Sequence, residues 1–92
     1  MITWDENKRQ ANLAKRGIDF AEAETIFDHR MVTREDTRVA YGEQRLQSIA
    51  LLNGRVVVVI WTERKTGAHI ISIRKATKHE QETYFRLAGK PD

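Results

Sequence analysis

The dipeptide Asn53-Gly54, set between two apolar segments, constrains the possible folds of this chain more than any other feature. Residues 44–52 and 55–62 have the composition of strands, and positions 56–61 form a continuous apolar run rich in β-branched side chains. A type I′ turn needs positive φ at both central residues, and Asn-Gly tolerates this best. The sequence therefore predicts an antiparallel hairpin with a two-residue loop, in which residues 55–62 form a central strand.

The two faces of this hairpin differ in composition. Side chains alternate between the faces of a strand, so a two-residue loop assigns every residue to one face or the other. The face that we expect the helices to cover carries Ile49, Leu51, Val56, Val58 and Ile60. The opposite face carries Leu46, Ser48, Ala50, Val57, Val59 and Trp61, with Arg55 at its edge. This mixed face is predicted to be open, and it suits either nucleic-acid bases or a docked protein.

Two helices are predicted at the start of the chain. The first covers residues 5–16, with either Thr3 or Asp5 as its N-cap, and Leu13 is expected to carry much of its burial. The second begins at Asp19, which has capping-box spacing with the glutamate three positions later. Its apolar residues recur on one helical face: Phe20, Ala23, Ile26 and Phe27.

The remaining segments complete the predicted architecture. A short strand is expected at 31–36 and a fourth strand at 69–74, with Ile71 and Ile73 in the core. A last helix begins after Thr77. This order predicts one α+β domain over residues 1–92, with two N-terminal helices, a three- to four-stranded antiparallel sheet and a C-terminal helix. We expect the helices to pack on one side of the sheet.

The composition excludes several classes of protein. A chain of 92 residues without cysteine has no disulfide, no thiolate metal site and no cysteine nucleophile. No apolar run approaches the roughly 20 residues that span a bilayer, and the first residues do not resemble a signal peptide. We therefore expect a cytoplasmic protein that does not enter a membrane. The histidines have no metal-binding spacing and no nucleotide-binding motif occurs, so neither a metal nor a cofactor is predicted.

The charge balance is mildly basic. Sixteen Lys and Arg against thirteen Asp and Glu give a net charge of +3. This balance permits a nucleic-acid partner. Ordinary solubilising charge is the alternative, and the composition favours a nucleic-acid partner only slightly.

Four residues with suitable chemistry are expected to converge where the last strand meets the last helix: Arg74, Lys75, Glu80 and Tyr84. Cleavage of RNA without a metal needs a base for the 2′-hydroxyl, a cation for the phosphate and an acid for the leaving oxygen. Glu80 suits the base, Arg74 the cation, and Tyr84 or Lys75 the acid. The alternatives remain open: Glu80 as a capping partner of Thr77, Tyr84 as a core residue and Arg74 as a solvated strand end.

A second charged group is expected at the other end of the central strand. It contains Arg45, Arg64 and Lys65, interleaved with Glu43 and Glu63. Hairpin pairing places Glu43 opposite Arg64, so a surface salt bridge is the favoured interpretation. At the usual strand rise this group lies roughly 20 Å from Arg74, so both groups contact one RNA only if its strand crosses the sheet.

Several blocks of residues are spread along the chain: Trp4-Asp5, Lys8, Asn12, Lys15-Arg16-Gly17, Phe20, Ala23, Ile26-Phe27-Asp28, Gly42-Glu43-Gln44-Arg45, Trp61-Thr62-Glu63-Arg64, residues 70–76, Glu80 and Tyr84. Together these blocks resemble BrnT-type toxins. The blocks occur in order from about residue 2 to residue 85. No single block is decisive, and the ordered set is specific.

This resemblance implies a RelE-like α+β fold and a metal-independent endoribonuclease that blocks translation. It also implies a BrnA-type ribbon-helix-helix antitoxin, which neutralises the toxin in a heterotetramer with an antitoxin dimer and alone contacts the operator DNA. Carried over position by position, the candidate catalytic residues are Arg74, Glu80, Tyr84, Glu63 and Arg64. The candidate RNA-binding residues are Arg45, Lys75 and Arg55.

Two other interpretations remain. Arg16 stands where many members of the family have histidine, which is compatible with a decayed toxin. Such a chain is either a non-catalytic RNA-binding module or a module that only binds an antitoxin.

Overall fold

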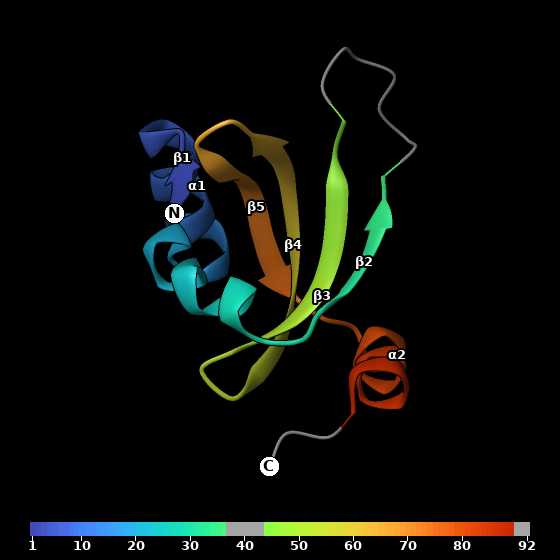
Figure 1. Ribbon diagram of the computed structural model, residues 1–92. Coiled ribbons are helices and arrows are strands. Elements are labelled where there is room, and N and C mark those ends of the chain that lie inside the picture. The colour runs from blue at the N-terminus through green and yellow to red at the C-terminus, as the bar shows by residue number, and fades with distance from the viewer. Residues whose placement is uncertain (37–43, 90–92) are drawn as a thin grey trace.

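A five-stranded sheet with the order β1-β5-β4-β3-β2 forms the centre of the fold (Figure 1). The structure, a computed structural model, describes residues 1–36 and 44–89. The strands are β1 (Ile2–Trp4), β2 (Val32–Glu35), β3 (Leu46–Leu52), β4 (Arg55–Arg64) and β5 (Gly67–Lys75). The helices are α1 (Glu6–Arg16), the 3₁₀ helix η1 (Phe20–Asp28) and α2 (Lys78–Ala88). The predicted α+β class is confirmed.

The hairpin of β3 and β4 has the predicted loop and register. Leu52 pairs with Arg55 and Ile49 with Val58. Positive φ angles of 50° at Asn53 and 78° at Gly54 match the type I′ turn. Because β4 lies between β3 and β5, the prediction of a central strand is confirmed.

The first strand was not predicted. β1 pairs in parallel with β5, so the sheet is mixed and has five strands, where the sequence predicted three or four antiparallel ones. Thr3 lies in this strand, and Asp5 is the N-cap of α1 because its carboxylate accepts from the backbone N–H groups of Asn7 and Lys8. Three residues of strand are too few to show a hydrophobic alternation in the sequence.

The second predicted helix is present with a tighter geometry. It is the 3₁₀ helix η1, and Asp19 caps it by accepting from the N–H of Ala21. Its buried residues are Phe20, Ala23 and Ile26. A spacing of three places these side chains on one face when the helix has three residues per turn.

Helices cover both faces of the sheet, which corrects the expectation of helices on one side. Figure 1 shows α1 and η1 on one side and α2 on the other. The α1–η1 side has buried side chains at Ala50, Val57, Val59 and Trp61, so the face predicted to be open is the main core. This mixed face can be buried because Trp61 Nε1 donates to Ser48 Oγ at 2.8 Å, which satisfies both polar groups.

The opposite face, which the sequence assigned to the helices as a whole, packs against α2 alone. Its buried residues are Val56, Val58, Ala76 and Tyr84. The helix lies over β2 and β3, and neighbouring side chains such as Ile49 and Ile60 stay half-buried. In the part of the chain that the structure describes, no helix is long and apolar enough to cross a membrane.

A register shift between Ile60 and Trp61 changes the alternation along β5. Ile60 pairs with Ser72 and Trp61 with Ile70, so Ile71 is the extra residue of a bulge. Ile70 and Ile73 are therefore both fully buried on the α1–η1 side, and the expectation that Ile71 joins Ile73 in the core is wrong.

A buried amide attaches α1 to the sheet. Asn12 Nδ2 donates to the carbonyl of Ile18 at 3.0 Å, and Asn12 Oδ1 accepts from the N–H of Ile73 at 3.3 Å. β1 extends only to Trp4, opposite Ile70, so the Asn12 amide takes over as partner of the β5 edge beyond that point. Leu13, expected to carry much of the burial of this helix, is 36% exposed.

Candidate functional site

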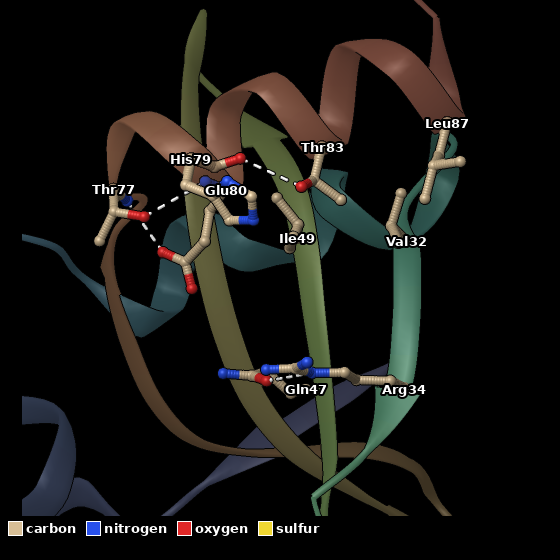
Figure 2. Close-up of a pocket in the computed structure, with 9 residues that line it drawn as sticks. All are labelled: Val32, Arg34, Gln47, Ile49, Thr77, His79, Glu80, Thr83 and Leu87. Carbon is tan, nitrogen blue, oxygen red and sulfur yellow. Dashed lines mark hydrogen bonds between the residues drawn. The ribbon is translucent and has the colours of Figure 1, made fainter.

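A groove of about 410 Å³ lies between α2 and the strands β2 and β3, on the sheet face that α2 covers only in part. Figure 2 shows its lining: Val32, Arg34, Gln47, Ile49, Thr77, His79, Glu80, Thr83 and Leu87. Apolar side chains form its floor and polar groups stand around it. A shallow opening of this kind fits an extended or flat ligand better than an enclosed small molecule.

An ion pair joins the end of β5 to the first turn of α2 beside this groove. Both guanidinium nitrogens Nη1 and Nη2 of Arg74 donate to the two carboxylate oxygens of Glu80 at 2.8 Å. Arg74 reaches this face because it pairs with Val58, whose side chain points the same way. The predicted convergence of Arg74 and Glu80 is therefore present.

Glu80 also forms the capping box of α2. Its Oε1 accepts from the N–H of Thr77 at 2.8 Å, while Thr77 Oγ1 accepts from the N–H of Glu80 at 3.2 Å. The hydrogen bonds from Arg74, supported by the Thr77 N–H, lower the pKa of Glu80 to about 2. Glu80 thus remains a carboxylate at neutral pH and has little tendency to accept a proton.

Lys75 and Tyr84 have other surroundings. Lys75 pairs with Val57 and so lies on the α1–η1 side of β5, opposite to Arg74. Tyr84 is buried, its ring packs edge-to-face against Phe85, and its hydroxyl lies 3.4 Å from the carbonyl oxygen of Arg30. Tyr84 is therefore a core residue in the structure. Its role as a catalytic acid stays a prediction.

The other predicted residues lie along the length of the central hairpin. Arg55 begins the ten-residue strand β4 next to the turn, and Glu63 and Arg64 end it, at a distance of roughly 30 Å. Arg45 immediately precedes β3. The expected partner of Arg64, Glu43, lies outside the described residues. The structure therefore brings together Arg74 and Glu80 and spreads the remaining candidates over the sheet.

The sequence reasoning missed two titratable residues of the groove, Arg34 and His79. Arg34 Nε donates to Gln47 Oε1 at 2.7 Å across the β2–β3 pair. His79 is exposed in the first turn of α2, and its carbonyl oxygen accepts from Thr83 Oγ1 at 3.0 Å. The capping box at Thr77 could have indicated His79, because it places that residue in the first turn. The register of β2, which brings Arg34 to the groove, has no signal in the sequence.

Arg34 and Arg74 are cations on the same face of the sheet. Arg34 pairs with Gln47, which pairs with Ile60, and Ile60 shares its face with Arg74. The two arginines lie on β2 and β5, three strand spacings apart, which is roughly 14 Å across the sheet. Within residues 1–36 and 44–89, no three His, Asp or Glu side chains gather as they would around a metal ion.

Comparison with models of protein families identifies a family for this chain. A family model described as the ribonuclease toxin, BrnT, of a type II toxin-antitoxin system matches residues 4–80. The matched region begins at the last residue of β1 and ends at Glu80, so it includes the strands β2 to β5 and the ion pair. No curated protein matches the chain.

Proposed function

Because this chain belongs to the BrnT family of ribonuclease toxins of type II toxin-antitoxin systems, we propose that it cleaves RNA internally, without a metal ion, and so blocks translation. The family includes ribonucleases, and an antitoxin partner follows from the type of system. Metal-free cleavage needs a fixed cation near the scissile phosphate, because charge develops on the phosphate oxygens. Arg74 beside the groove is the observation that carries the proposal.

Arg74 is suited to this role by its geometry. A guanidinium that already holds two carboxylate oxygens at 2.8 Å presents the same fork to two phosphate oxygens. A phosphate takes the place of the Glu80 carboxylate, and Glu80 keeps its bond to the Thr77 N–H. In this arrangement Glu80 positions Arg74 before RNA binds, and Arg74 contacts the phosphate.

The remaining basic residues extend the RNA path. Arg45 and Arg64, next to β3 and at the end of β4, are proposed to contact the RNA backbone at a distance from the cleaved bond. Arg55 and Lys75 pair with Leu52 and Val57, which are buried on the α1–η1 side, so they stay proposals as RNA-binding residues away from the groove. Glu63, Arg64 and Tyr84 stay proposals as catalytic residues, Glu63 and Arg64 through their exposed position at the end of β4 and Tyr84 through its position one turn after Glu80.

We propose that a BrnA-type ribbon-helix-helix antitoxin covers the groove and that its dimer binds two toxin chains in a heterotetramer. The exposed side chain of Leu87, 61% accessible at the rim of the groove, suits such a contact. In this assembly operator DNA is bound by the antitoxin alone. The toxin acts in the cytoplasm as one RelE-like domain over residues 1–92.

A non-catalytic chain that only binds RNA or the antitoxin is the second candidate. The observation in its favour is that Glu80, the base expected from the sequence, has a pKa of about 2 and both its oxygens bonded. Arg16, which stands where many members of the family have histidine, is an exposed residue in the last turn of α1.

Purified chain incubated with bulk RNA in EDTA tests the proposal. Arg74→Ala should lose about a hundredfold or more of the cleavage rate, because it removes the cation proposed to contact the scissile phosphate. Glu80→Ala should also reduce cleavage, because the Arg74 guanidinium is then no longer held in place by the Glu80 carboxylate. Arg86→Ala, which changes an exposed arginine of the last turn of α2, is the matched control and should cleave as the parent does. A folded parent chain that binds RNA and never cleaves it supports the second candidate.

A further inference from the structure

Three titratable side chains line the groove among the described residues: Arg34, His79 and Glu80. An arginine guanidinium does not release its proton in proteins. Before RNA binds, Glu80 does not take one near neutral pH, because its carboxylate is held by Arg74 and the Thr77 N–H. His79 is therefore the one of the three with a side chain able both to accept and to donate a proton under ordinary conditions.

His79 is well placed for RNA bound in the groove. It lies in the first turn of α2 next to Glu80, and its side chain is exposed rather than packed in the core. Figure 2 shows its imidazole extending from α2 toward Ile49, with Arg34 and Gln47 on the far side of the groove. Ile49 belongs to β3, and β3 lies between β2, the strand of Arg34, and β5, the strand of Arg74.

We propose that His79 is the catalytic acid–base residue of this groove and acts on the 2′-hydroxyl of an RNA strand whose phosphates contact Arg34 and Arg74. This inference rests on the proposed ribonuclease function and adds a residue that the sequence did not suggest. The two cations, roughly 14 Å apart across the sheet, hold the RNA strand along the groove, where the imidazole of His79 faces it.

The proposed step is balanced in atoms and charge. The neutral imidazole takes the proton of the 2′-hydroxyl, and the 2′ oxygen forms a bond to phosphorus as the bond from phosphorus to the 5′ oxygen breaks. The leaving 5′ oxygen takes a proton from water, and the resulting hydroxide takes the proton from the imidazolium. The products are a 2′,3′-cyclic phosphate and a free 5′-hydroxyl, and His79 is neutral again.

The test compares His79→Gln and His79→Ala with the parent chain on a fluorescent single-stranded RNA in EDTA. Cleavage rate and RNA affinity are measured at the same salt concentration, and the cyclic phosphate end is identified by mass spectrometry. General acid–base groups contribute about 10²- to 10⁴-fold, so we expect a rate loss of that size in both variants with RNA affinity changed less than threefold. Added imidazole should restore part of the activity of His79→Ala.

His29→Gln is the matched control, because His29 is also an exposed histidine and does not line the groove. It should cleave RNA at the rate of the parent. If the parent cleaves RNA and His79→Gln cleaves it within threefold of the same rate, the assignment of His79 is wrong and the proposed function stands. If the folded parent chain cleaves no RNA, the proposed function fails and the assignment fails with it.

Discussion

Replacing Glu80 with glutamine should destabilise this protein at neutral pH by removing one charge from a formed ion pair. Arg74 donates two hydrogen bonds of 2.8 Å to the Glu80 carboxylate, and the N–H of Thr77 donates a third. Glutamine keeps an oxygen for Thr77 and retains the capping box, since Gln also serves at this position. The substitution therefore isolates the contribution of the charge that connects β5 to α2.

The expected loss of stability in Glu80→Gln follows from the pKa of Glu80 and from the exposure of the Arg74 and Glu80 side chains. The pKa of Glu80 is lowered from 4.5 to about 2, chiefly by the hydrogen bonds from Arg74. One pKa unit corresponds to about 1.4 kcal/mol, which sets an upper limit of ~3 kcal/mol. The side chains of Arg74 and Glu80 retain 31% and 18% of their exposure, and solvent screening reduces the value to about 1–2 kcal/mol.

The direction of the Glu80 pKa shift determines how the contribution of the ion pair to stability changes with pH. A carboxyl group whose pKa is lower in the folded state stabilises the protein above its unfolded pKa, near 4.5, and this contribution is lost as the pH falls toward 2. Glu80→Gln should thus be less stable than the parent at pH 7, and the difference should narrow as the pH falls below 4.5.

Urea unfolding, followed by tryptophan fluorescence from pH 7 downward, measures this difference. Glu82→Gln, an exposed change in the same helix, is the control and should stay within about 0.5 kcal/mol of the parent. Equal stability of Glu80→Gln and the parent at pH 7 would refute the reasoning. A difference in unfolding free energy that stays the same at every pH at which both proteins fold would also refute it.

Two further substitutions test how the sheet is held. Asn12→Leu leaves the carbonyl of Ile18 and the N–H of Ile73 buried without partners, so we expect a loss of about 2–4 kcal/mol in urea unfolding, with Leu13→Ala much closer to the parent. Gly67→Ala should lower the melting temperature measured by circular dichroism, because φ is +118° there and an added Cβ would overlap the carbonyl oxygen of Met1. An unchanged melting temperature would show that β1 shifts without cost.

The features of the fold that could be predicted are those coded by neighbouring residues. Asn53-Gly54 determined the hairpin and its register, and the capping box at Thr77 determined the start of α2. The faces of the sheet were assigned the wrong way round because four consecutive residues of β4, 56–59, are buried. A strand buried on both faces has no polar alternation to show which helix covers which side.

The bulge on β5 explains why the sequence wrongly placed Ile71 in the core. The extra residue, Ile71, moves the buried position from 71 to 70 while leaving 73 in place, and a pattern of strict alternation cannot show it. The pairing of β1 with β5 was equally beyond the sequence, because three residues must find a partner more than 60 positions away. Both features depend on contacts between distant parts of the chain.

The same distinction holds at the candidate site. Arg74 and Glu80 could be placed together because six residues separate them across one strand-to-helix connection. Arg34 joins the groove only through the pairing of β2 with β3, whose register is not coded locally. His79 was visible in the sequence and was set aside because a lone histidine has no metal-binding pattern, although proton transfer needs no second histidine.

The blocks that carry the family resemblance include residues that have a structural role in the fold. Asn12 bonds the edge of β5, and Trp61 bonds Ser48 inside the core. Both are polar or aromatic, so either could be mistaken for a site residue when only the blocks are known. Arg34 and His79 lie outside those blocks and line the groove. Exchanging them should therefore alter RNA cleavage and leave unfolding in urea nearly unchanged, whereas exchanging Asn12 should first alter stability.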